Sequence, residues 1–254
     1  EPGAFRKLIA QEAGVSEENL LATDLYLYPR TAGTLTGMKE EFVVSPRLDD
    51  LQCVFGCLRG FLAAEESGSV PVLAVFNNEE VGSGTRQGAD STFLSDVLRR
   101  INAAMGRSEE DYLTAVANSF LVSADNAHAV HPAHPEYADG NEAPVLNGGV
   151  VIKYNASQRY TTDAVSAAVF RQVCDEAEVP LQRYSNRADL PGGSTLGNIS
   201  TAHVSIHSVD IGLPQLAMHS AYELAGALDT EYLVRTMTAF FGRSFSVGPN
   251  GIKI

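Results

Sequence analysis

The chain has 254 residues, of which 44% are hydrophobic and 19% charged, a composition typical of globular proteins with a sizeable core. Its net charge of -13 argues against a nucleic-acid partner, because phosphate binding needs a concentrated basic surface. No apolar run approaches the roughly 20 residues of a membrane helix, so we expect no membrane partner. The three cysteines form no CxxC pair, and this odd number predicts a reducing, cytoplasmic location.

Residues 1–44 show no sustained hydrophobic period. A short amphipathic stretch around Phe5–Ile9 is followed by a polar, Gly-rich segment at Thr31–Gly37. The sequence begins with Glu rather than Met, and its first residues read as the middle of an element. We therefore expect residues 1–44 to be the end of a larger unit in a longer polypeptide.

From residue 45 onward, predicted helices and strands alternate. Apolar residues three and four apart predict a helix over 48–62, and the continuous run VPVLAVF predicts a strand over 70–76 that is covered on both faces. The remaining predicted elements, in chain order, are a helix at 87–104, strands at 119–123 and 148–154, a helix at 161–178, a strand at 204–211 and a helix at 230–245. This alternation predicts an α/β fold with a largely parallel sheet and helices on both faces. Residues 126–147 form a long polar loop, a feature that is usually functional or mobile.

Carboxylates follow several of these elements. The strand at 70–76 runs into Glu79 and Glu80, the strand at 119–123 runs into Asp125, and the helix after Pro46 starts with Asp49 and Asp50. Ligands gather outside the carboxyl ends of parallel strands, so we expect these acids to converge. Converging carboxylates raise one another's pKa, and a divalent metal relieves that repulsion.

His219 is the candidate imidazole ligand, in the AMHS segment that follows Pro214. Alone, each feature has a simpler interpretation. An acid in a first helical turn is usually a partner of the helix dipole, and a single His is usually hydrogen-bonded in the core or at the surface. Their joint placement favours a metal site.

The Glu79–Glu80 pair predicts general-base hydrolysis. Consecutive side chains on an extended segment point in different directions. One carboxylate can therefore bind a metal while its neighbour accepts a proton from water. A glycosidase is disfavoured because its two carboxylates stand about 5–10 Å apart across a sugar ring. A serine hydrolase is disfavoured because the chain has no GxSxG motif.

Five segments in the same order carry a family resemblance. They are SPRLDD at 45–50, NEEVGS at 78–83, SADNAHAVHP at 123–132, VIKYN with QRY at 151–160, and PQLAMHS at 214–220. With them the chain resembles the aspartyl aminopeptidases, cytosolic di-zinc enzymes that remove N-terminal acidic residues from peptides. The resemblance implies an α/β/α catalytic domain with an inserted dimerisation domain. Residues 1–44 would be the remainder of the inserted domain, and residues 45–254 the C-terminal part of the catalytic domain.

The resemblance also implies roles for particular residues. Asp49 would bridge two zinc ions, Glu79 would be the general base, Glu80 and His219 would bind one metal, and Asp125 would bind the other. Lys153 and Tyr160 look like substrate contacts, and Gly193 lies in a segment similar to the family's Gly-rich loop beside the pocket. Cobalt and manganese use the same ligand types as zinc.

Further implications concern assembly and completeness. Family members form dimer-based homo-oligomers, up to tetrahedral dodecamers that admit only peptides. Their first metal ligand is a His in an upstream His-x-Asp motif, which we expect before residue 1. His128 and His131 are expected to position the loop rather than to bind metal. Two alternatives stay open: a catalytically incomplete assembly module, and a related di-metal aminopeptidase with another side-chain preference.

Overall fold

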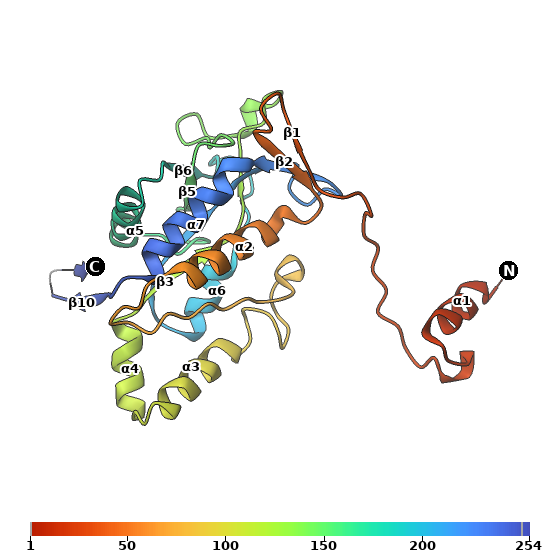
Figure 1. Ribbon diagram of the computed structural model, residues 1–254, viewed down its shortest axis with the longest axis horizontal. Helices are drawn as coiled ribbons and strands as arrows, with labels where there is room; N and C mark the ends of the chain where they lie inside the picture. Colours follow the sequence, from red (N-terminus) through yellow and green to blue (C-terminus); the bar gives the residue numbers. More distant parts are fainter. Residues whose placement is uncertain (1, 250) are drawn as a thin grey trace. The chain divides into compact units, whose positions relative to one another are not determined.

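A computed structural model describes residues 2–249 and 251–254 of the chain (Figure 1). The chain divides into two compact units, Glu1–Arg30 and Thr31–Ile254. The predicted division between residues 44 and 45 into parts of two domains stays a prediction. The smaller unit contains helix α1 (Ala4–Ala13) and the 3-10 turn η1 (Glu17–Asn19). Helix α1 ends at Gly14, whose φ of 68° is the left-handed conformation that commonly terminates helices.

A four-stranded sheet forms the centre of the larger unit. Its strands lie in the order β3 (Phe120–Ala124), β7 (His207–Gly212), β5 (Val150–Tyr154) and β6 (Leu181–Ser185). The pairs β3–β7 and β5–β6 are parallel, whereas β5 and β7 are antiparallel. The predicted α/β fold is confirmed, and this sheet is parallel in two of its three pairings.

Helices cover both faces of this sheet. On one face α2 (Leu48–Ala63), α5 (Ala164–Glu176) and α7 (Ala227–Phe241) form the hydrophobic core together with inward-facing strand residues. Val209 and Ile211 of β7 point into that core. Because side chains alternate along a strand, Asp210 points to the opposite face. Helix α6 (Leu196–His203) begins on that face, close to the Asp210 carboxylate.

A second sheet of five short strands was not predicted. Its order is β1 (Thr34–Thr36), β2 (Phe42–Ser45), β9 (Glu223–Gly226), β8 (Pro214–Leu216) and β4 (Ala127–His128). Only β4 and β8 pair in parallel; the other three pairings are antiparallel. Strands of two to four residues leave too little alternation for a sequence pattern to reveal. The remaining strands, β10 (Ser246–Gly248) and β11 (Gly251–Lys253), form an antiparallel pair.

The predicted strand over 70–76 is wrong. The segment forms no ladder with any strand of the described residues, and Val70 and Val75 are 57% and 53% exposed. A strand needs a neighbour that takes up its backbone N–H and C=O groups, and no described strand runs beside this segment. Its residues instead line a cavity of about 700 Å³, together with residues of β3, α3 (Phe93–Ala104) and α4 (Glu109–Ala117).

Other predicted elements differ at their boundaries. The helix expected from residue 87 begins only at Phe93, after a series of turns, and the strand expected from residue 204 begins at His207, after a short connection that follows α6. Helices α4 and α6 were missed. Helix α4 had a signal in the sequence, because Ser108 and Asp111 form a capping box at its start.

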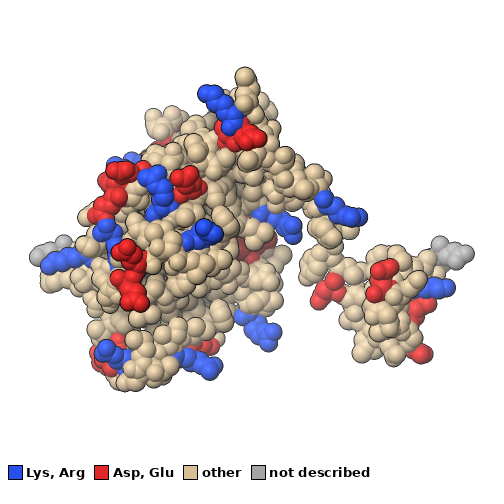
Figure 2. All heavy atoms as spheres, in the orientation of Figure 1, with Lys and Arg blue, Asp and Glu red and all other residues tan. Residues whose placement is uncertain are grey.

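Two properties bear on partners. Among the described residues, every helix is too short or too polar to cross a membrane. On the face shown in Figure 2, basic and acidic side chains are interspersed.

Candidate metal centre

Asp49 and Asp50 lie where β2 turns into α2. Arg47 adopts a left-handed conformation with φ of 60°, and Asp49 and Asp50 keep non-helical backbone angles at the start of the helix. The Asp49 N–H donates to the Glu223 Oε2 atom at 3.0 Å. The Asp49 side chain is only 5% exposed, so the turn presents its carboxylate to the interior of the site.

His219 lies in the turn between β8 and β9. Its backbone N–H donates to the Glu223 Oε1 atom at 2.8 Å. Glu223, which is 2% exposed, therefore uses one oxygen for the Asp49 backbone and the other for the His219 backbone. Sequence reasoning missed Glu223. The one available signal was a charged residue in a short apolar strand, ELAG.

Two groups of donor atoms meet at Asp49. The His219 Nε2 atom lies 3.2 Å from Asp49 Oδ2 and 3.2 Å from Glu80 Oε2. The donor atoms of this first group all lie within 4.8 Å of one another, as do those of a second group formed by Asp49, Asp50 and Asp125. All four predicted ligands are thus brought together, and Asp49 belongs to both groups. Asp50, which the sequence placed among the converging acids but to which the resemblance gave no ligand role, joins the second group.

The electrostatics of this cluster suit a divalent cation. Burial, followed by the charges of Asp125 and Glu80, raises the pKa of Asp49 to about 8. Burial and Asp125 also raise the pKa of Asp50 well above its usual range, and the Asp50 Oδ1 atom is buried without a hydrogen-bond partner. Carboxylate and imidazole donors at this spacing fit zinc, which would offset the mutual repulsion and give the orphaned oxygen a partner.

Glu79 belongs to neither donor group of the described residues. It begins the 3-10 turn η2 (Glu79–Val81), after Asn78 in the left-handed conformation, rather than ending a paired strand as predicted. Glu80, the next residue, points to His219. Burial, followed by the charges of Asp125 and Glu80, raises the pKa of Glu79 to about 7. A carboxylate with this pKa accepts and releases a proton near neutral pH.

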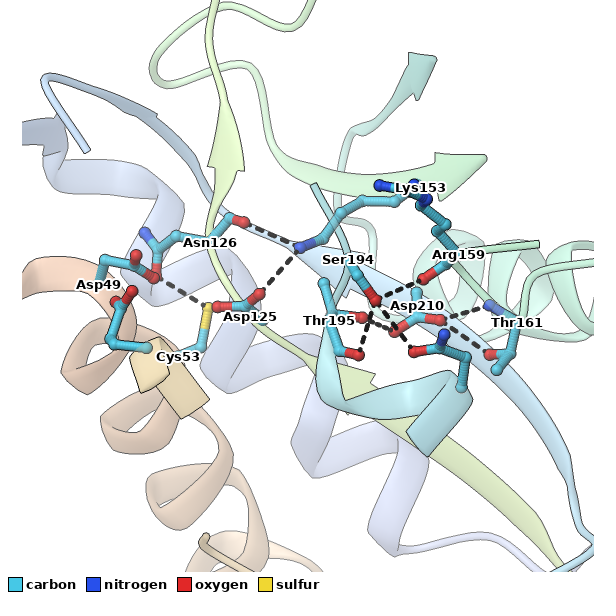
Figure 3. Close-up of polar contacts among 12 residues, drawn as sticks. Asp49, Cys53, Asp125, Asn126, Lys153, Arg159, Thr161, Ser194, Thr195 and Asp210 are labelled. Carbon is cyan, nitrogen blue, oxygen red and sulfur yellow. Dashed lines mark hydrogen bonds and ion pairs between the residues drawn. The ribbon is translucent and has the colours of Figure 1, made fainter. Parts of the chain in front are cut away.

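Lys153, at the end of β5, is directed at Asp125 (Figure 3). Its ammonium donates to the Asn126 backbone oxygen at 2.8 Å and to Asp125 Oδ2 at 3.4 Å, and it lies 5.4 Å from the centre of the Tyr160 ring. Burial alone would lower the pKa of Lys153, but the charges of Asp125, Tyr160 and Asp210 outweigh it and raise this pKa. Sequence reasoning did not predict the contact with Asp125.

Asn126 connects this contact to α2. Its side-chain oxygen accepts from the Cys53 thiol at 3.3 Å, and its amide nitrogen donates to Gln52 Oε1 at 3.0 Å. Cys53 and Cys57 belong to the hydrophobic core, since they are 0% and 6% exposed.

The remaining candidates lie apart from the two donor groups. Tyr160 is 5% exposed and packs between Lys153 and Tyr184, whereas Gly193 is exposed in the loop before α6. The His128 ring lies against Tyr184. The His131 ring contacts His134 at a centroid distance of 5.4 Å.

Comparison with known proteins gives concordant results. The model of the family "Aminopeptidase I zinc metalloprotease (M18)" matches residues 2–241. A probable M18 family aminopeptidase 2 of Clostridium acetobutylicum is 47% identical over 235 residues, which are 92% of this chain and 54% of the relative. The chain therefore spans about half the length of the curated relatives that it matches.

Solved structures agree with the sequence comparison. A chain in the cryo-EM structure of the Ape4 and Nbr1 complex has a TM-score of 0.84 and 37% identity, covering 93% of this chain and 48% of the other. The S. cerevisiae mApe1 dodecamer has a TM-score of 0.79 and 28% identity, covering 93% of this chain and 54% of the other.

Proposed function

Because the chain belongs to the aminopeptidase I zinc metalloprotease (M18) family, we propose that it supplies catalytic residues of a zinc aminopeptidase that removes N-terminal Asp or Glu from peptides. One observation carries the proposal: Asp49 is shared between a group with Glu80 and His219 and a group with Asp50 and Asp125. A carboxylate common to two donor groups suits a pair of metal ions.

The proposed ligands divide accordingly. Asp49 would contact both ions, Glu80 and His219 would hold one, and Asp125 would hold the other. Zinc bound there would supply Lewis acidity, which lowers the pKa of water and polarises a peptide carbonyl. Cobalt or manganese would fit the same donors. The second group contains carboxylates alone, so the proposal needs a further ligand for the second zinc ion, and the alternative without that ligand is an assembly module.

Glu79 is the proposed general base. Its carboxylate is free of the two donor groups, and its pKa of about 7, raised first by burial, suits proton transfer near neutrality. It would take a proton from the attacking water and pass it to the leaving amine. Glu223 would hold Asp49 and His219 beside each other, because its two oxygens accept hydrogen bonds from their backbone N–H groups.

The preference for acidic residues is proposed on the buried charge of Lys153. Its ammonium lies beside both Asp125, a proposed metal ligand, and Tyr160, a proposed substrate contact. It therefore supplies positive potential between the metal site and the substrate. Gly193 would face the substrate from the loop before α6. The substrates are peptides, and the dodecameric state of mApe1 supports a homo-oligomer for the whole protein.

The test is kinetic and analytical. Aspartyl, glutamyl and leucyl substrates are compared for wild type and Glu79→Gln, with zinc measured in both proteins; Glu66→Gln, at an exposed position, is the matched control. We expect Glu79→Gln to lower kcat by about 10²- to 10⁴-fold with zinc retained. Full activity of that variant would remove Glu79 as the base. Preference for leucyl substrates would favour the related aminopeptidase, and absence of bound zinc would favour the assembly module.

A further inference from the structure

Asp210 is a fully buried carboxylate in the middle of β7, with no role in the proposed chemistry so far. It is 0% exposed and points to the face of the sheet where α6 begins. Burial of a charged carboxylate is costly unless hydrogen bonds replace its water. The groups that supply those hydrogen bonds therefore indicate what Asp210 does.

Both oxygens of Asp210 are used, and their donors come from two separate segments (Figure 3). The Oδ2 atom accepts from the Thr161 N–H at 2.5 Å and from the Thr161 hydroxyl at 2.9 Å. The Oδ1 atom accepts from the Thr195 hydroxyl at 2.6 Å. The Asp210 N–H also donates to the Thr162 hydroxyl at 3.0 Å. One carboxylate thus binds both the loop of Thr161 and the loop of Thr195, residues that are 34 positions apart in the sequence.

These two loops carry the residues proposed to contact substrate. Thr161 directly follows Tyr160, and Thr195 comes two residues after Gly193. Above Asp210 the loops are joined a second time, because the Arg159 guanidinium donates to the Gly192 backbone oxygen at 2.8 Å. The contacts with Asp210 are the buried ones, since Thr195 is 3% exposed.

The packing leaves Asp210 little freedom. A Cβ atom on Gly197, in the first turn of α6, would lie 2.4 Å from Asp210 Oδ1, so the helix is pressed against the carboxylate. The charge of Asp210, like that of Asp125, also acts on the Lys153 ammonium. Asp210 is therefore packed against the two loops and α6.

We infer that Asp210 is a positioning residue that holds segments 159–162 and 192–195 in one arrangement and thereby fixes the substrate wall formed by Tyr160 and Gly193. The substrate assignment rests on the proposed function, whereas the coupling of the two loops does not. Asp210 makes no contact with reacting atoms in this scheme, so its loss affects substrate binding more than the chemical step.

Thr195→Val is the decisive variant, because it removes one hydroxyl donor while keeping the shape of the side chain. Thr236→Val is the matched control: Thr236 is also buried, but its hydroxyl donates within α7, to the Tyr232 backbone oxygen. Hydrogen–deuterium exchange is measured on the zinc-loaded full chain in peptides covering 155–162 and 190–198. KM and kcat are measured on an aspartyl substrate.

We expect Thr195→Val to accelerate exchange in both segments and to raise KM about tenfold, as for loss of one hydrogen bond to a carboxylate, with kcat within about threefold of wild type. Thr195→Ser should restore both readouts, and Thr236→Val should change neither. Faster exchange confined to 190–198, or an unchanged KM in an active protein, would overturn the inference. If wild type itself lacks activity, the proposed function fails, while the exchange in 155–162 still decides whether Asp210 couples the loops.

Discussion

Replacement of Gly60 by Ala should push α2 away from α7 and destabilise the protein. The two helices pack closely at Gly60, and α2 carries Asp49 in its first turn. A Cβ atom at Gly60 would lie 2.5 Å from Met237 Cβ, 2.8 Å from the Met237 backbone carbon and 2.9 Å from the Thr238 nitrogen. Backbone atoms cannot move aside as a side chain can. Overpacking of this kind costs about 1–3 kcal/mol, while Gly→Ala in a helix returns about 1 kcal/mol. The net loss in the free energy of unfolding is then about 0–2 kcal/mol, and we expect the upper half of that range because the clash involves backbone atoms.

Gly56→Ala is the matched control in the same helix. Its added Cβ would meet the Leu233 side chain, with Cδ2 at 2.6 Å, Cγ at 2.9 Å and Cβ at 3.2 Å, and these three nearest atoms include no backbone atom. Urea unfolding followed by circular dichroism should therefore place the midpoint of Gly60→Ala below that of Gly56→Ala. Equal midpoints for the two variants, or a Gly60→Ala protein more stable than wild type, would refute the packing argument.

Two further predictions concern protons. Burial raises the pKa of Asp229 to about 6, against the opposing hydrogen bonds from the Gly149 and Asn147 N–H groups. A raised carboxyl pKa stabilises the fold at low pH, and this contribution is lost as the pH rises through 6. Between pH 4 and 7, wild type should thus lose about 2 kcal/mol more unfolding free energy than Asp229→Asn, and an equal loss in the two proteins would contradict this. Because burial and neighbouring carboxylates raise the pKa of Asp49 to about 8 and that of Asp50 well above its usual range, zinc binding at pH 7 should release at least about one proton. Calorimetry in buffers of different ionisation enthalpy measures this release, and zero release would contradict the assignment.

The site was more predictable than the fold around it. The sequence identified four candidate ligands because acids and a His expected at one edge of a sheet are typical of a metal site. They are Asp49, Glu80, Asp125 and His219, and in each of the two groups that the structure forms the donor atoms lie within 4.8 Å of one another. Their roles as ligands stay predictions. Glu223 and Asp210 could not be identified in this way, because each acts through backbone or hydroxyl donors that only the tertiary structure brings near.

The error at 70–76 has a different origin. The apolar run VPVLAVF predicted a covered strand, but such a run shows only that a segment would be stable as a strand if a neighbour covered it. Whether a ladder forms depends on a neighbouring strand, and none of the described strands runs beside this segment. The short strands β4, β8 and β9 are the converse case, since they pair although their sequences show no clear alternation.

Charge balance links the metal centre to the substrate loops. Lys153 is a buried cation whose raised pKa reflects Asp125, Tyr160 and Asp210, after the opposing effect of burial. Asp125 is a proposed metal ligand, whereas Asp210 holds Thr161 and Thr195. A dication bound beside Asp125 would compete with Lys153 for that carboxylate, leaving more of the lysine charge to act toward Asp210 and Tyr160. With Asp125 as the proposed metal ligand, Lys153 would therefore link metal binding to the charge balance beside Tyr160.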